Sequence, residues 1–107
     1  MSDTQEQVAT STTTQIQPPS LYDVIFFNDQ KTHYEFVVLI LMHLFGKSYE
    51  QATEITDYIH ANGKATVGTY VHEIASTKRD EAIQTARNNG HPLKVEIEPS
   101  SIQADLS

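Results

Sequence analysis

Asp29 and His60 are the two residues whose types could form a reactive pair, because a carboxylate beside an imidazole makes a general base. No nucleophile and no set of oxyanion donors can be named beside them. The sequence also lacks a glycine-rich phosphate loop, a G-x-S-x-G turn and an H-E-x-x-H pair. We therefore predict that the protein is not an enzyme and has no catalytic residues. A small hydrolase that uses Asp29 and His60 is the less favoured alternative.

The positions of these polar residues have a simpler interpretation as well. Asn28 and Asp29 directly follow an apolar run, and His60 stands just before Asn62-Gly63, a pair that ends helices. By spacing alone we favour an Asx-type turn at Asn28 and Asp29 and a hydrogen-bonded cap residue at His60.

The histidines do not have the spacing of metal ligands, and the chain contains no cysteine. We predict no metal site and no cofactor, with each histidine at the surface or hydrogen-bonded locally. The five histidines are His33, His43, His60, His72 and His91.

Size and charge restrict the function further. A chain of 107 residues has room for one core, so we expect one domain. A net charge of -7 disfavours nucleic acid, whose phosphates need Lys and Arg. Neither a signal peptide nor an anchor is visible, and the apolar run over 36–45 is too short to span a bilayer. We expect a soluble, intracellular protein without membrane or nucleic-acid partners.

The first half of the chain predicts a tail, a strand and two helices. Residues 1–19 are rich in Ser, Thr and Gln and predict a flexible tail. Residues 22–27 favour a buried strand. Thr32-His33-Tyr34-Glu35 has the spacing of a capping box before a helix that ends at Gly46. Ser48-Tyr49-Glu50-Gln51 repeats that pattern before a second helix.

The second half predicts two strands around a helix. Residues 65–70 read as a strand, in which Gly68 indicates a bulge or a close backbone approach. A helix begins near Val71, carries small residues on one side and ends at Asn88-Asn89-Gly90. Residues 93–98 alternate as a half-buried strand does, and residues 99–107 read as a loose C-terminal tail. The β-α-α-β-α-β order predicts a compact α+β domain over 20–98, with three helices against a small antiparallel three-stranded sheet.

Several dispersed motifs resemble those of the ClpS family, adaptors of the ATP-dependent Clp protease. They fall in the family's order over residues 18–98 without an evident gap. The matching residues are Pro18-Pro19-Ser20-Leu21-Tyr22-Asp23-Val24-Ile25, Asn28-Asp29, Thr32, Glu35-Phe36-Val37, Ala52, His60, Gly63-Lys64-Ala65, Gly68, Glu73, Ala75, Thr77-Lys78 and His91-Pro92-Leu93.

The resemblance implies an N-end rule adaptor that binds the first residue of N-degron substrates. In the family, the polar trio that matches Asn28, Asp29 and His60 holds the α-amino group. A bulky hydrophobic first side chain then enters an apolar pocket, which corresponds here to Thr32, Tyr34, Val37, Thr56, Ile59 and Leu93. Tyr34 and Thr56 stand where the family usually has methionines, which leaves the range of accepted side chains open.

The resemblance also implies a partner, the amino-terminal domain of a AAA+ Clp unfoldase of the ClpA or ClpC type. Glu73 and Lys78 match positions on the unfoldase-binding face, although an ordinary exposed helix pair would also explain them. We expect a monomer in the bacterial cytosol, with the chloroplast stroma as the alternative location. The second functional hypothesis is a divergent ClpS-like regulator that docks on the unfoldase without recognising N-terminal residues.

Overall fold

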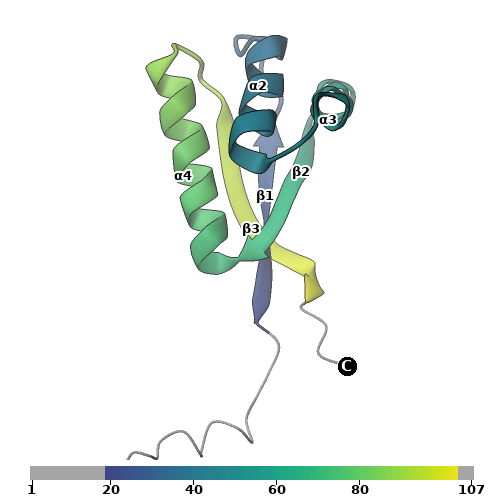
Figure 1. Cartoon of the computed structure of the whole chain (residues 1–107), viewed down its shortest axis with the longest axis vertical. Helices are drawn as coiled ribbons and strands as arrows, with labels where there is room; N and C mark the ends of the chain where they lie inside the picture. Colours follow the sequence, from purple (N-terminus) through teal and green to yellow (C-terminus); the bar gives the residue numbers. More distant parts are fainter. Residues whose placement is uncertain (1–18, 104–107) are drawn as a thin grey trace, which may run out of the picture.

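The computed structural model describes residues 19–103, and its elements follow the predicted β-α-α-β-α-β order (Figure 1). The elements are β1 (Ser20–Phe27), α2 (Tyr34–Phe45), α3 (Tyr49–Asn62), β2 (Lys64–Val71), α4 (His72–Asn88) and β3 (Lys94–Gln103). The predicted α+β class, the antiparallel three-stranded sheet and the three helices are confirmed.

Strand β1 lies in the middle of the sheet, in the order β2-β1-β3, and pairs antiparallel with both neighbours. Its register with β2 shifts after Val24, which pairs with Gly68, whereas Ile25 pairs with Thr66. A Cβ added at Gly68 would lie 2.5 Å from the Tyr70 hydroxyl oxygen. The predicted bulge therefore lies beside Gly68, while the close approach there is made by the Tyr70 side chain and not by another backbone segment.

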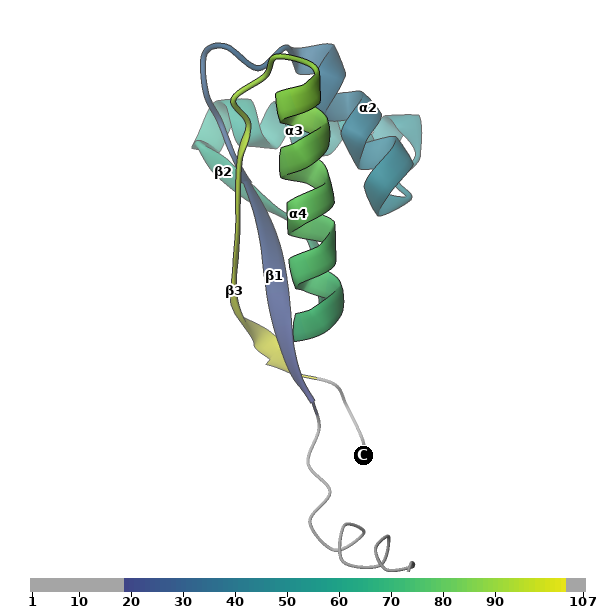
Figure 2. The ribbon, with the colours of Figure 1, turned by 90° about the vertical axis from the view of Figure 1, so that its left-hand side faces the viewer.

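The helices cover one face of the sheet, along which α4 runs (Figure 2). Helix α4 contacts all three strands, and its fully buried residues are Ala75, Ala82 and Ala86. Their small side chains let the helix lie close to the sheet. Helix α2 contacts both other helices and β2, so it completes the helical layer.

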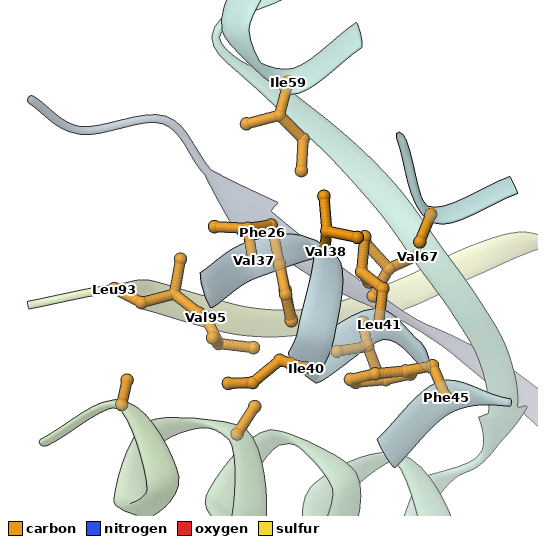
Figure 3. Packing of buried hydrophobic residues seen from close by; sticks show 14 of the residues in the cluster. Phe26, Val37, Val38, Ile40, Leu41, Phe45, Ile59, Val67, Leu93 and Val95 are labelled. Atoms are coloured by element: carbon orange, nitrogen blue, oxygen red, sulfur yellow. The ribbon is translucent and has the colours of Figure 1, made fainter. Parts of the chain in front are cut away.

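The core forms between this layer and the sheet, where side chains of α2 pack among those of all three strands (Figure 3). Phe26 of β1 and Phe45 of α2 meet edge to face, with ring centroids 5.4 Å apart. Val37, Ile59 and Leu93 belong to the same cluster and lie at the end of the sheet where β1 finishes. The core therefore supplies apolar side chains directly to that end.

The connection between α2 and α3 follows the sequence closely. Gly46 ends α2 with a φ of 67°. Ser48 Oγ accepts from the Gln51 amide and Gln51 Oε1 accepts from the Ser48 amide, each at 3.0 Å. This is the predicted capping box, and it fixes where α3 begins.

The predicted end of the domain is wrong. Strand β3 continues to Gln103, which pairs with Ser20, so residues 99–103 are not a loose tail. Pro99 lacks an amide hydrogen, but β3 is an edge strand and can hold it within the pairing. The predicted N-terminal tail up to residue 18, and residues 104–107, lie outside the described residues.

Candidate functional site

A pocket of about 470 Å³ opens at the end of the sheet, where β1 leads into α2 and α3 leads into β2. All nine residues that the sequence predicts for the binding site line it, although they come from three separate stretches of the chain. The lining residues are Phe27, Asn28, Asp29, Gln30, Thr32, Tyr34, Val37, Thr56, Asp57, Ile59, His60 and Leu93.

The turn after β1 is built around the carboxylate of Asp29. Its Oδ1 accepts from the amides of Lys31 and Thr32, and its Oδ2 accepts from the Thr32 hydroxyl, each at 2.7 Å. Burial alone would raise the pKa of Asp29, but the hydrogen bonds from Thr32 and Lys31 outweigh burial and hold that pKa below its ordinary value of 3.8. Asp29 is therefore ionised at neutral pH. The Asx-type turn predicted at Asn28 and Asp29 is present, and it is formed by the side chain of Asp29.

The capping box predicted at Thr32 is wrong, because these hydrogen bonds use the Thr32 hydroxyl. The Thr32 hydroxyl donates to Asp29, and α2 instead begins after His33, whose side chain makes no capping bond. An ionised carboxylate three residues earlier is the stronger partner for that hydroxyl. As a result, Thr32 faces the pocket as part of the Asp29 turn.

A backbone hydrogen bond joins the two segments that carry the polar trio. The Asn28 amide donates to the Gly63 carbonyl at 2.8 Å, next to the end of α3. Gly63 has a φ of 92°, a left-handed conformation that glycine adopts readily and that turns the chain into β2. Within residues 19–103, neither the Asn28 side chain nor the His60 imidazole has a hydrogen-bond partner. Both side chains are exposed at the pocket.

The floor of the pocket is apolar and buried. Val37, Ile59 and Leu93 are exposed by 7%, 4% and 2%, and Thr56 by 5%. The Thr56 hydroxyl donates to the Ala52 carbonyl at 2.7 Å, which satisfies its hydrogen within α3. The floor can therefore accept an apolar group without leaving a donor unpaired.

Tyr34 and Asp57 form a hydrogen bond at the pocket, with 2.8 Å between Tyr34 Oη and Asp57 Oδ1. The hydrogen bond to Asp57 raises the pKa of Tyr34 above its ordinary value of 10.0, with burial and the charge of Asp57 adding to the effect. The sequence interpretation missed Asp57, together with Phe27 and Gln30. Asp57 lies three residues before His60 on α3, so helical spacing was the available signal.

The geometry does not form the pair that a hydrolase needs. The Asp29 carboxylate binds Thr32 and the Lys31 amide, and no hydrogen bond links it to His60. An imidazole without an orienting carboxylate is a weak general base. The arrangement instead brings three acceptor types, an amide oxygen, a carboxylate and an imidazole nitrogen, beside an apolar floor.

Glu73 and Lys78 lie on α4 and do not line this pocket. Glu73 is exposed in the first turn. Lys78 is half-buried, and its ammonium donates to the Leu44 carbonyl at 2.6 Å. The structure thus gives Lys78 an internal partner that the sequence did not indicate.

In the part of the chain that the structure describes, no group of three or more His, Asp or Glu residues could hold a metal ion. Among the helices between residues 19 and 103, none has the length and apolar character needed to cross a membrane.

Comparisons with known proteins agree on one family. The family model described as ATP-dependent Clp protease adaptor protein ClpS matches residues 17–96. The chain is 42% identical over 87 residues to the ATP-dependent Clp protease adapter protein ClpS of Albidiferax ferrireducens, which covers 81% of this chain and 72% of that protein. It is 46% identical over 83 residues to the ClpS of Janthinobacterium sp. (strain Marseille), covering 78% and 81% of the two chains.

A solved structure is also similar, that of Agrobacterium tumefaciens ClpS2 bound to L-phenylalaninamide. The TM-score is 0.75 at 34% sequence identity, and the superposition covers 77% of this chain and 99% of that chain. The likeness therefore extends over nearly the whole described domain.

Proposed function

The chain belongs to the ClpS family of ATP-dependent Clp protease adaptors, and from that premise we propose that its pocket binds the free α-amino group and bulky hydrophobic first residue of N-degron substrates. The adaptor then delivers those substrates to a AAA+ Clp unfoldase. Adaptors of this family assist the Clp protease and are not themselves the protease.

One observation carries the proposal: a polar group of acceptors and a buried apolar floor share one pocket. Asn28, Asp29 and His60 are the acceptors, and each can receive a hydrogen bond from an ammonium group. The A. tumefaciens relative binds L-phenylalaninamide, a molecule with a free α-amino group and an aromatic side chain. A pocket of this composition suits the same two groups.

Asp29 contributes charge as well as an acceptor site. A carboxylate has about four lone-pair positions, and three of them are used by Lys31 and Thr32. One position therefore stays open for the amine. The lowered pKa of Asp29 keeps its carboxylate negative at neutral pH. The net charge of -7 also favours the approach of a cationic terminus.

The floor supplies the apolar part of the affinity. Burial of a Phe or Leu side chain against Val37, Ile59 and Leu93 contributes about 1.5 to 3 kcal/mol. Acetylation of the first residue removes the positive charge and two of the three ammonium donors, so an acetylated peptide keeps the apolar contact and loses the amine contact.

Delivery requires a second surface, which we propose on α4 with Glu73 exposed toward the partner. The partner is the amino-terminal domain of an unfoldase of the ClpA or ClpC type. We further propose a monomer that acts in the bacterial cytosol, in keeping with its bacterial relatives.

The test is a titration of labelled peptides that begin with Phe, Leu, Tyr, Trp or Arg, and of a peptide that begins with acetyl-Phe. We expect the free Phe and Leu peptides to bind at least about tenfold more tightly than acetyl-Phe, the ratio that about 1.4 kcal/mol of lost amine contacts produces. The variants His60→Ala and Asn28→Ala should each lower this ratio of free to acetylated peptide affinity. Equal affinity for free and acetylated Phe in the wild-type protein would overturn the proposal.

The three internal hydrogen bonds of Asp29 are also compatible with a second candidate function. If its three internal hydrogen bonds leave Asp29 unable to receive an amine, the chain is a regulator that docks on the unfoldase and does not read N-terminal residues. Binding to the unfoldase domain together with equal affinity for free and acetylated peptides would identify this regulator.

A further inference from the structure

The hydrogen bond between Tyr34 and Asp57 joins two helices across 23 positions of the sequence. Tyr34 is the first residue of α2, and Asp57 lies in the middle of α3. Both side chains line the pocket. The bond therefore connects two walls of the pocket that lie far apart in the sequence.

This bond belongs to the rim of the pocket and not to its floor. Tyr34 is 44% exposed and Asp57 is exposed, whereas the residues of the floor are buried. A side chain that enters the pocket from solvent has to pass the rim before it reaches the floor. The position of the Tyr34 ring therefore affects the width available to an incoming side chain.

The donor of this bond is present at neutral pH, because the pKa of Tyr34 lies above its ordinary value of 10.0. Asp57 has no other hydrogen bond or ion pair within residues 19–103. A free tyrosine ring at a helix start would sample several rotamers. The contact with Asp57 selects the one that places the hydroxyl against α3.

We propose that Asp57 is a positioning residue for substrate choice: by accepting from Tyr34 it holds the phenol ring at one place on the rim, and so favours narrow first side chains over wide ones. This inference rests on the proposed function. A Leu side chain enters with the bond intact. The indole of Trp is the widest first side chain, and it has to displace the ring and break the bond.

The experiment measures the ratio of affinities for two free-amine peptides, which begin with Trp and with Leu and are otherwise identical. Asp57→Ala removes the acceptor, Tyr34→Phe removes the donor and keeps the ring, and the double variant removes both. We expect each single variant to raise the affinity for Trp relative to Leu by about threefold to tenfold, the effect of one hydrogen bond. The double variant should give the same ratio as either single variant, because the two residues act as one pair.

Two further variants separate this role from charge and from folding. Glu54→Ala removes the same charge one turn earlier on α3, outside this pocket, and should leave the ratio unchanged. Asp57→Asn keeps an oxygen that can accept from Tyr34, so its ratio should stay near that of the wild-type protein. The exposed position of the pair makes all these variants compatible with folding, which a thermal melt of each one checks.

This inference is overturned if the Trp-to-Leu ratio of affinities stays within twofold of wild type in both Asp57→Ala and Tyr34→Phe while free Phe is still preferred over acetylated Phe. The proposed function would then still stand. A changed ratio in Glu54→Ala equal to that in Asp57→Ala would also overturn it, because charge alone would then explain the effect. If the wild-type protein does not prefer free over acetylated Phe, the proposed function fails and this inference fails with it.

Discussion

Lys78 gives the most direct test of how the helical layer is held together. Its ammonium on α4 donates to the carbonyl of Leu44, in the last turn of α2, at 2.6 Å. The last carbonyls of a helix have no partner within the helix and carry partial negative charge. A cation there therefore gains both a hydrogen bond and a favourable charge interaction. The ammonium also lies 5.9 Å from the centre of the Phe45 ring.

The perturbation is Lys78→Met, which keeps a long apolar side chain and removes the ammonium. A hydrogen bond to a charged group contributes about 1.5 to 3 kcal/mol when it is shielded from water. Lys78 is only half-buried, so solvent screens the contact and we expect a smaller loss, about 1 to 2 kcal/mol. At about 4 to 8 °C per kcal/mol for a domain of this size, the Tm falls by about 5 to 15 °C.

The assay is urea unfolding followed by far-ultraviolet circular dichroism, which gives the free energy of unfolding from the midpoint and the slope. Lys31→Met is the matched control, because Lys31 is exposed and its side chain makes no hydrogen bond or ion pair in the described part of the chain. A loss below about 0.3 kcal/mol in Lys78→Met, or an equal loss in Lys31→Met, would refute the reasoning that the Leu44 contact stabilises the fold.

Three other variants test single contacts. Ser48→Ala removes one half of the capping box and should lower the free energy of unfolding by about 1 kcal/mol in the same urea assay; an unchanged midpoint would contradict that role. Thr32→Val removes a donor that lowers the pKa of Asp29, so this pKa should rise toward 3.8 in a carboxyl NMR titration. A native pKa below the unfolded value adds stability above about pH 4, and this stability is lost as the pH falls through the native pKa. Thr32→Val should therefore lose less stability than the wild-type protein on acidification. An unchanged pKa of Asp29 would show that the Thr32 hydroxyl does not lower it. Glu73→Gln should weaken binding to the amino-terminal domain of a Clp unfoldase with only a small fall in melting temperature, since Glu73 is exposed in the first turn of α4; unchanged binding would remove Glu73 from the docking surface.

Much of the fold could be predicted from the sequence because local signals agreed with the tertiary structure. The structure agrees with the helix end predicted at Gly46 and with the helix start predicted by the capping box at Ser48. It also agrees with the strand face predicted by the alternation after Leu93. The extension of β3 past Pro99 could not be predicted in this way. Pro-Ser-Ser is typical of a loop, and only pairing with the distant β1 makes it a strand.

The site shows the same division between local and distant effects. Tyr34 could be placed at the pocket through the family resemblance, but its partner Asp57 lies 23 residues away and reads in the sequence as an ordinary charged residue on an exposed helix face. The capping box at Thr32 failed because Asp29, three residues earlier, competes for the same hydroxyl. Competition between two acceptors depends on a geometry that spacing alone does not give.

The position of β1 in the sheet has a consequence for how the protein is made. Of the strands within residues 19–103, β1 is the first to leave the ribosome, yet its two partners are residues 64–71 and residues 94–103. Every strand pairing therefore spans a long stretch of chain, and one edge of this apolar strand stays open until β3 has been synthesised. An open apolar edge is prone to pair with other chains. Nascent chains that stall before residue 94 should consequently be the species most at risk of aggregation.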